Sequence, residues 1–114
     1  MISTDLLKGS LKTIVLKTLE ENGRMYGYQI TRKVEEQSSG KIVLTFGALY
    51  PVLHKLESEG VLQVTKELHN NRVRIYYSLT PKGHSMVKDK LRELNEFIES
   101  LQLIVKPSTG LSYA

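Results

Sequence analysis

The chain has 114 residues, and its 16 Lys and Arg residues outnumber its 12 Asp and Glu residues, which gives a formal net charge of +4. This length fits a single domain with a modest core and excludes a catalytic domain with separate binding and reaction modules. The lack of cysteine excludes disulfides, thiolate metal sites and a cysteine nucleophile, and the basic excess favours a polyanionic partner.

Two amphipathic helices are predicted in the first third of the chain. The first covers residues 5–21 and gathers its apolar side chains on one stripe, which consists of Leu7, Leu11, Ile14, Val15, Thr18 and Leu19. The second covers residues 26–38, precedes a Ser-Gly turn and buries Tyr26, Ile30 and Val34. Each helix therefore has one face for a core.

A third helix is predicted over residues 45–58, with Thr45 as its N-cap and Gly60 as its stop. One side of this helix carries Phe46, Leu49, Val52, Leu53 and Leu56. The other side carries Gly47, Pro51, His54, Lys55 and Ser58. A slim, neutral-to-basic face with hydrogen-bonding groups is typical of a helix that enters the DNA major groove.

A β-hairpin is predicted directly after this helix. Residues 61–68 and 73–79 alternate in polarity, and an Asn-Asn pair between them suits a tight turn. The second strand places Val73, Ile75, Tyr77 and Leu79 on one face and Arg74, Tyr76 and Ser78 on the other. The tip and the outward face carry Lys66, Asn70, Asn71, Arg72 and Arg74. Three helices followed by a hairpin predict a winged helix-turn-helix, an α+β fold that is mainly α.

A long last helix is predicted from residue 82 to residue 104, with Thr80 as N-cap and Pro81 in its first turn. Its apolar residues follow a seam spaced alternately by four and three positions, which is typical of a coiled coil and predicts a homodimer. The predicted interface comprises Val87, Leu91, Leu94, Phe97, Ile98 and Leu101. The domain organisation is thus a DNA-binding domain over 1–80, a dimerisation helix over 81–106 and a disordered tail over 107–114.

Three segments carry a more specific pattern. They are Tyr26-Gly27-Tyr28-Gln29-Ile30, the block of residues 47–62 with Leu49-Tyr50-Pro51 and Leu56-Glu57 inside it, and residues 74–83 with Leu79-Thr80-Pro81-Lys82-Gly83. These segments closely resemble the PadR-like transcriptional regulators. With Leu6-Leu7-Lys8-Gly9-Ser10 at the front, the resemblance covers about residues 5–100.

The resemblance implies a homodimeric repressor that binds an inverted-repeat operator, and the short C-terminal region is similar to that of members with a single dimerisation helix. Members often control efflux-pump or stress-response genes, and some respond to planar hydrophobic compounds held between the dimer helices. Two departures stand out. Ala48 replaces a common Thr, and the wing has only Arg72 and Arg74 where the family is often rich in Gly and Arg.

Eleven residues are candidates for contact with double-stranded DNA. They are Thr45, Gly47, Tyr50, Pro51, His54 and Lys55 on the third helix, Asn71, Arg72 and Arg74 on the wing, and Arg32 and Lys33 on the second helix. The basic side chains suit phosphates better than bases. Simpler interpretations stay open: a packed ring for Tyr50, a tolerated proline for Pro51, a solvated His54, and a charged surface pair for Arg32 and Lys33. Tyr26, Tyr28 and Tyr76 are assigned to packing between the helices and the wing.

A small hydrophobic or aromatic effector is a further hypothesis. Leu94, Phe97 and Ile98 would line an apolar gap between the paired helices. The alternative is a fully packed interface, because the chain has no Trp to stack on a flat compound.

Other classes of function find little support in the sequence. The three His residues stand far apart, and neither a Gly-rich phosphate loop nor a nucleophile turn is present. We therefore expect no enzyme activity, no metal and no cofactor. No apolar run approaches the roughly 20 residues of a membrane span, so a cytoplasmic protein without a membrane partner is expected. The rival interpretation is a winged-helix adaptor that uses the face of residues 50–55 to bind a protein.

Overall fold

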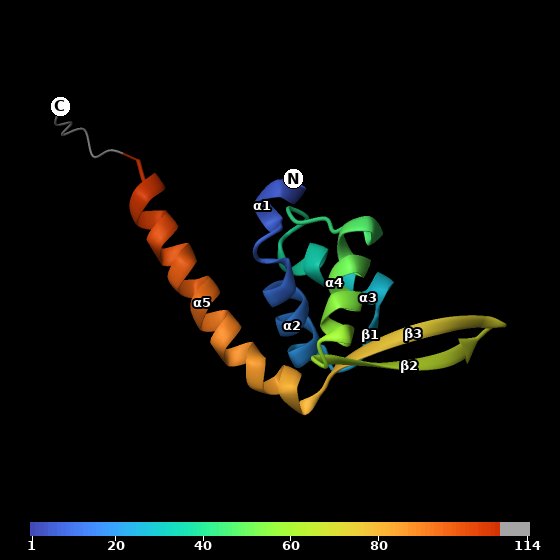
Figure 1. Cartoon of the computed structure of the whole chain (residues 1–114). Helices are drawn as coiled ribbons and strands as arrows, with labels where there is room; N and C mark the ends of the chain where they lie inside the picture. Colours follow the sequence, from blue (N-terminus) through green and yellow to red (C-terminus); the bar gives the residue numbers. More distant parts are fainter. Residues whose placement is uncertain (108–114) are drawn as a thin grey trace.

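The computed structural model describes residues 1–107. The elements in chain order are α1 (Thr4–Leu7), α2 (Leu11–Asn22), β1 (Met25–Tyr26), α3 (Gly27–Gln37), α4 (Phe46–Ser58), β2 (Leu62–His69), β3 (Arg72–Leu79) and α5 (Pro81–Val105). The β2–β3 hairpin and α5 project from a small helical body in different directions (Figure 1). The predicted winged helix-turn-helix, mainly helical with a long C-terminal helix, is confirmed.

The predicted first helix is in fact two helices. Ser3 caps α1 by accepting a hydrogen bond from the Leu6 backbone N–H at 3.4 Å. The chain then breaks at residues 8–10, where the backbone N–H of Ser10 donates to the Leu7 carbonyl at 3.0 Å. Gly9 has low helical propensity, and the Ser10 hydroxyl donates to the Leu7 carbonyl at 3.1 Å instead of capping α2, so the break closes α1 before a new helix begins at Leu11.

The second helix also begins later than predicted. Tyr26 is extended in β1, where it pairs with Tyr76 of β3 and lies half-buried, and α3 starts at Gly27. The Gln29 side chain accepts a hydrogen bond from the Tyr26 backbone N–H at 3.2 Å, which closes this helix start. The packing expected for Tyr28 is wrong: it is 54% exposed because the first turn of α3 turns it away from the core.

The core surrounds α2. Val15, Leu16 and Leu19 on this helix are 0–2% exposed, and α2 contacts α3, α4, α5 and β3. The other fully enclosed side chains come from these neighbours and from the residue just before β2: Ile30, Leu49, Leu53, Leu56, Val61, Tyr77 and Val87. At roughly 25 cal/mol per Å² of buried apolar surface, such a cluster is the main favourable term in folding this domain.

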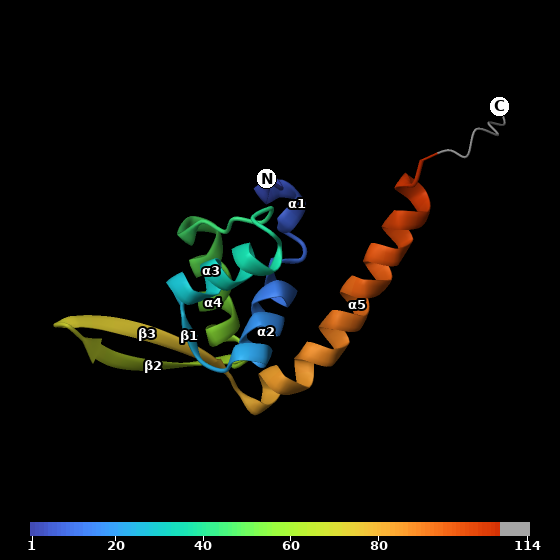
Figure 2. The same cartoon turned by 180° about the vertical axis from the view of Figure 1, so that it is seen from behind.

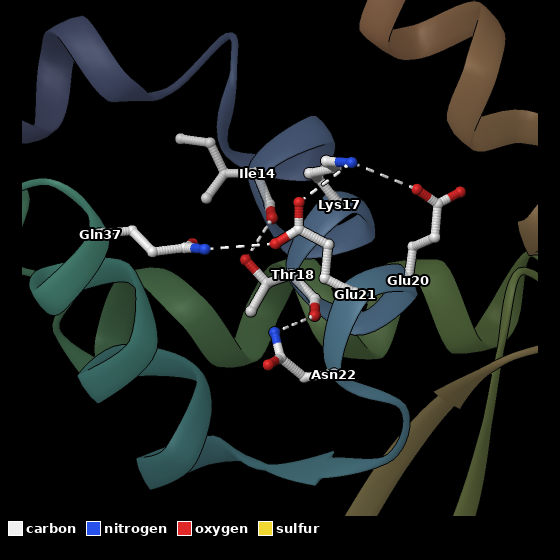
Figure 3. A network of polar contacts seen from close by, with 7 residues as sticks. All are labelled: Ile14, Lys17, Thr18, Glu20, Glu21, Asn22 and Gln37. Atoms are coloured by element: carbon white, nitrogen blue, oxygen red, sulfur yellow. Dashed lines mark hydrogen bonds and ion pairs between the residues drawn. The ribbon is translucent and has the colours of Figure 1, made fainter.

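A polar network ties α2 to α3 on the surface of the body (Figure 3). Glu21 accepts a hydrogen bond from Gln37 of α3 at 3.2 Å and lies 3.0 Å from the Lys17 ammonium. The hydrogen bond with Lys17 is the main reason that the pKa of Glu21 lies below its ordinary value. The same pair raises the pKa of Lys17. Within this network the Gln37–Glu21 bond is the link between α2 and α3, and it adds an exposed contact to the packing of the two helices in the core.

The sheet has the strand order β1-β3-β2, and all pairs are antiparallel. The β2–β3 register runs from Leu62↔Leu79 to His69↔Arg72. Asn70 and Asn71 have φ angles of 50° and 63°, the left-handed conformation that a two-residue hairpin turn requires. The hairpin predicted from the Asn pair is therefore confirmed.

The predicted alternation of β3 holds only near the core. Tyr77 and Leu79 are buried as expected, but Val73 and Ile75 are exposed because the outer half of the hairpin extends beyond the helices (Figure 2). Tyr76, on the opposite face, is buried because Tyr26 and Arg24 cover its ring. The sequence pattern gives the two faces but not how far the body extends under them.

The start of α5 is anchored to the body. The Thr80 hydroxyl accepts from the Gly83 backbone N–H at 3.2 Å and donates to the Gly60 carbonyl at 2.6 Å, which confirms the predicted cap. Val87 is 1% exposed inside the core of its own chain, so it has no surface to offer a second chain and the predicted interface is wrong at this position. Leu91 also packs partly against the core.

The C-terminal half of α5 diverges from the body in both views (Figures 1 and 2). Phe97, on the seam side, is 57% exposed, and the exposed apolar residues that follow are Ile98, Leu101, Leu103, Ile104 and Val105. The predicted disordered tail falls almost wholly outside the described residues. Within residues 1–107, no helix combines the length and apolar character needed to cross a membrane, and no group of three His, Asp or Glu side chains could hold a metal ion.

Candidate nucleic-acid interface

Helix α4 presents the predicted polar face to solvent. Thr45 caps the helix by accepting a hydrogen bond from the Ala48 backbone N–H at 3.2 Å. Leu49, Leu53 and Leu56 anchor the opposite side in the core. The exposed face comprises Thr45, Gly47, Pro51, His54, Lys55 and Ser58, and no acidic residue occurs before Glu57. A helix of 13 residues is about 20 Å long, which suits the major groove.

An aromatic row follows the outer face of α4. The Phe46 and Tyr50 ring centroids are 5.7 Å apart, and those of Tyr50 and His54 are 6.0 Å apart. The prediction that Phe46 lies on the core side is wrong, because it is 49% exposed. The error has a plain cause, since at the first turn of the helix the body does not yet cover the apolar stripe. The spacing i, i+4, i+8 of these three rings was the signal that the sequence offered.

Tyr50 joins this row to α3. The side chain is half-buried, and a Cβ placed on Gly27 would lie 2.6 Å from the Tyr50 hydroxyl. Only a residue without a side chain therefore lets Tyr50 lie across the start of α3. The packing interpretation of Tyr50 is supported by this contact, while the half-exposed ring leaves its other edge open to a ligand.

Pro51 lies in the sixth position of α4, and the helix continues through it to Ser58. Proline cannot donate to the carbonyl four residues earlier, so the Gly47 carbonyl lacks its helical partner. This part of α4 and the short helix α1 border a hollow of about 430 Å³, which Lys8 and Thr4 line from the α1 side. Lys8 thus stands beside the start of α4, a position that the helix pattern of residues 5–21 did not reveal.

The α3 candidates lie along a second hollow. Arg32 and Lys33, with Arg24, Tyr28, Gln29 and Glu36 among their neighbours, line an open polar depression of about 450 Å³. Arg32 is half-exposed and lies 3.8 Å from Glu36, so the charged surface pair considered from the sequence is present in part. The depression nevertheless holds more basic than acidic side chains.

The wing, defined as the β2–β3 hairpin, carries cations near its tip. Asn71 and Arg72 are exposed, and Lys66 lies on β2, opposite Ile75. Arg74 is only half-exposed, with its guanidinium 4.6 Å from the centroid of the Tyr26 ring. Of the two wing arginines, Arg72 is therefore the one more open to a partner.

A cluster that the sequence did not reveal lies where the wing meets the body. We name it the wing-base cluster, and its members are Arg24, Tyr26, Glu67, Arg74 and Tyr76. Arg24 forms an ion pair with Glu67 and stacks over Tyr76, 4.2 Å from the ring centroid. The hydrogen bond from Arg24 is the main reason that the pKa of Glu67 lies below its ordinary value. Because Arg24 and Glu67 are 43 residues apart, periodicity alone could not pair them.

The candidate residues form two separate groups. The nucleic-acid candidates lie on α3, α4 and the wing, all connected to one body, whereas Leu94, Phe97 and Ile98 lie along α5. These three line one side of an apolar hollow of about 450 Å³, and α1 and α2 supply the other side through Leu6, Leu7, Thr13 and Ile14. The contribution of the N-terminal helices to this hollow was not predicted.

Comparison with known proteins gives a consistent result. Residues 15–89 match the family described as transcriptional regulator PadR-like. The structure is similar to that of a transcriptional regulator from Clostridium thermocellum, with a TM-score of 0.81 and 29% identity over 93% of this chain and 100% of that one. It is also similar to a PadR-like transcription factor from Bacteroides fragilis, with a TM-score of 0.70 and 25% identity over 90% of this chain and 96% of that one.

A shorter match involves a curated protein. A transcriptional regulator of Mycobacterium tuberculosis is 38% identical over 50 residues, which are 44% of this chain and 47% of that protein.

Proposed function

The chain belongs to the PadR-like family of transcriptional regulators, and on that premise we propose that it is a repressor that binds an inverted-repeat operator as a homodimer. The observation that carries this proposal is the exposed face of α4, which has no acidic residue over its first ten positions and stands next to a wing with cations near its tip. Such a surface suits the edges of bases and the phosphates on either side of them.

Helix α4 enters the major groove in this proposal. Thr45, Gly47, Tyr50, Pro51 and His54 lie nearest the base edges, and Phe46 joins them because an aromatic edge can contact the methyl group of thymine. A hydroxyl, an imidazole and a free backbone carbonyl supply donors and acceptors in this row. These groups would determine sequence choice.

The basic residues around α4 contact the DNA backbone. Lys55 flanks the base-reading row, Arg32 and Lys33 approach from α3, and Asn71, Arg72 and Arg74 approach from the wing. Contacts with phosphates raise affinity for every sequence and make binding depend on salt. They fix the position of α4 on the duplex without selecting bases.

Dimerisation takes place through α5. Its outer half carries an apolar stripe in which Leu94 is half-buried and Phe97, Ile98 and Leu101 are exposed, and exposed stripes of this kind favour burial against an identical helix. Leu91 lies at the inner limit of the stripe, and Val87 is left out because it belongs to the core. Two α4 helices in such a dimer would reach half-sites about one helical turn, roughly 34 Å, apart.

A small hydrophobic effector would bind between the paired α5 helices, where Leu94, Phe97 and Ile98 also border the hollow that α5 forms with the α1–α2 segment. Phe97 and Ile98 provide apolar contact, and Thr13 and Glu93 are polar groups at its edge. A ligand that binds one arrangement of α5 better than another shifts the population and so changes half-site spacing. Isothermal calorimetry with planar aromatic compounds tests this step; no heat with any of them would favour a fully packed interface.

Fluorescence anisotropy is the test of the main proposal. The probe is a labelled duplex with the DNA immediately upstream of this protein's own gene, measured at two salt concentrations with an excess of unrelated competitor DNA. Nanomolar binding that survives the competitor supports an autoregulated repressor. Weak binding that disappears with salt at this duplex and at a random-sequence pool contradicts sequence-specific regulation and favours the adaptor interpretation.

A matched pair of variants sharpens the test. His54→Ala removes a candidate base contact from the exposed face, whereas Ser58→Ala changes a residue at the last turn of the same helix, whose hydroxyl bonds to the Lys55 carbonyl. We expect His54→Ala to reduce discrimination between operator and random DNA about tenfold, as removal of one good base contact should. Ser58→Ala should leave discrimination unchanged.

A further inference from the structure

The wing has little support from the sheet beyond its base. β1 is two residues long and pairs with β3 only at Met25↔Tyr77 and Tyr26↔Tyr76. The outer ladder, from Lys66↔Ile75 to His69↔Arg72, has no third strand beside it in the part of the chain that the structure describes. Isolated two-stranded hairpins are marginally stable in water, so other contacts determine the direction of the wing.

Arg24 supplies such a contact from the loop before β1. Its Nη2 donates to both carboxylate oxygens of Glu67, at 2.8 Å and 2.5 Å. The same guanidinium lies 4.2 Å from the centroid of the Tyr76 ring. Tyr76 is opposite Thr65 in the ladder, and Glu67 lies two residues further out. One side chain of the body therefore holds the hairpin beyond the last residue that β1 pairs.

Glu67 has a second arginine close by, because Arg74 is its cross-strand partner. Its carboxylate is nevertheless bonded to Arg24, and the Arg74 guanidinium lies over the Tyr26 ring instead. Tyr26 meets Tyr76 edge to face, with ring centroids 5.5 Å apart. The contacts are thus reciprocal, since a body arginine covers a wing tyrosine and a wing arginine covers a body tyrosine.

We infer that Arg24 and Glu67 are positioning residues for DNA binding, whose pair sets the angle at which the wing meets the duplex while α4 occupies the major groove. This inference rests on the proposed function. If the pair is broken, the outer half of the wing samples more directions, and the DNA must order it again on binding. That ordering cost appears as weaker binding and as weaker protection of the DNA at the wing alone.

Glu67→Gln gives the sharpest test, because simple electrostatics predicts tighter DNA binding and loss of positioning predicts weaker DNA binding. Removing an acid near DNA should tighten binding if only net charge matters. Loss of positioning should instead weaken binding to the upstream duplex about five- to tenfold. Hydroxyl-radical footprints should lose protection where the wing meets the backbone and keep it over the α4 groove. Tighter binding with an unchanged footprint would overturn the inference.

Two further variants control the test. Glu36→Gln removes an acid that is paired with Arg32 on α3, outside the wing-base cluster, so it should bind equally well or more tightly. The exchange Arg24→Glu with Glu67→Arg keeps the net charge and can restore the pair in reverse. It should recover most of the affinity that Arg24→Gln loses. In this exchange the introduced arginine on β2 lies opposite Arg74, where like charges repel. No recovery would therefore overturn the inference, and make Arg24 a direct phosphate contact, when Glu67→Gln also leaves the wing footprint unchanged.

A measurement without DNA separates this inference from the proposed function. Because the chain lacks cysteine, spin labels at Val73→Cys, which is 62% exposed near the wing tip, and at Ser58→Cys report one distance between the wing and the body, with labelled chain diluted into an excess of unlabelled chain. The distance distribution should be narrow in the parent and clearly broader with Glu67→Gln or Arg24→Gln. Equal widths would refute positioning even if the parent binds its operator. A broader distance distribution in the variants would support positioning of the wing even if the parent failed to bind an operator.

Discussion

The wing and α5 both project from the same body (Figure 1), but the body holds them differently. The wing is braced by strand pairing and stacked rings near its base and by an ion pair further out, and its turn is polar. Helix α5 is anchored through its first turns and exposes apolar side chains along its outer half. The braced projection suits a charged partner met in one orientation, whereas the unbraced apolar one suits a second copy that completes its packing.

The difference also predicts where each projection is sensitive. A mutation on the outer half of α5 should act through assembly, because the fold of its own chain depends little on those side chains. A mutation at the wing tip should act through salt-dependent contact with DNA. A mutation at the junction of the wing and α5 should lower the stability of the fold, since both projections start there.

The largest expected effect is on the α5 stripe. Leu94→Glu combined with Ile98→Glu places four carboxylates in the interface of the proposed dimer, and each buried unpaired charge costs several kcal/mol. We expect the dimer dissociation constant to rise at least about a thousandfold, with monomers in sedimentation velocity at micromolar concentration. Operator binding should fall with it.

The matched control adds the same charge elsewhere on α5. Ser85→Glu combined with Ser100→Glu changes two exposed residues outside the apolar seam. This variant should sediment as a dimer. An intact dimer with the Leu94 and Ile98 substitutions would show that the seam is not the interface.

The next largest effect concerns the junction at Gly83. A Cβ there would collide with the Val61 carbonyl oxygen, which also accepts a hydrogen bond from the Thr80 backbone N–H and therefore cannot shift freely. Gly83→Ala should destabilise the fold by about 2–3 kcal/mol and lower Tm by roughly 10–20 °C. Thermal unfolding followed by circular dichroism measures this change.

Gly9→Ala is the control for the junction, because a Cβ at Gly9 would meet nothing within 4 Å. Its Tm should stay within a few degrees of the parent. If both alanine variants unfolded at the parental temperature, the backbone around Gly83 would be adaptable, and the two projections would not share a rigid starting point.

Local signals explain which parts of the fold the sequence could predict. Thr45 and Thr80 cap their helices through bonds to residues three positions ahead, and the Asn70-Asn71 turn depends on its own φ preferences. The break at residues 8–10 is also local, yet the apolar stripe continued across it and hid it. Cap and turn chemistry was therefore more reliable here than periodicity.

Long-range contacts explain the rest. Phe46 and Val73 fit apolar patterns but lie where the body ends, so they are exposed. Val87 fits the α5 seam, yet the body covers it. Arg24 has no pattern at all, because its partners Glu67 and Tyr76 lie on the hairpin. In each case the sequence could not show whether the helical body reaches far enough to cover or contact the residue.

A smaller effect on DNA binding is expected when an arginine is removed from the wing, and an arginine of α5 provides the comparison. Arg72→Ala at the wing tip should weaken binding to operator and unrelated DNA alike, about three- to tenfold, and lower the salt slope by about one for each phosphate that Arg72 neutralises. Arg92→Ala removes the same charge from an exposed side chain on α5. Its slope should match the parent. Equal salt slopes for the two variants would mean that Arg72 neutralises no more DNA phosphate charge than Arg92 does.

The smallest effect is the pH dependence of the wing brace. The hydrogen bond from Arg24 holds the pKa of Glu67 below its ordinary value of 4.5, with a further contribution from His69. A carboxyl group with a depressed pKa stabilises the folded arrangement above its unfolded pKa and loses that contribution as the pH falls through the folded pKa. The brace should therefore be intact at pH 7 and weaken only below about pH 4.5.

Spin-label distances between Val73→Cys and Ser58→Cys at pH 6 and at pH 3 measure this change. Arginine stays charged throughout this range, so Arg24 and the facing Arg74 do not change, and His69 lies 3.7 Å from the same carboxylate. Comparison with Glu67→Gln therefore separates protonation of Glu67 from every other change that acid causes. The parent distribution should broaden at pH 3 toward that of Glu67→Gln, whereas Glu67→Gln itself should hardly change. If both chains broadened alike, acid would be acting on the body, and the wing would be no more strongly braced than α5.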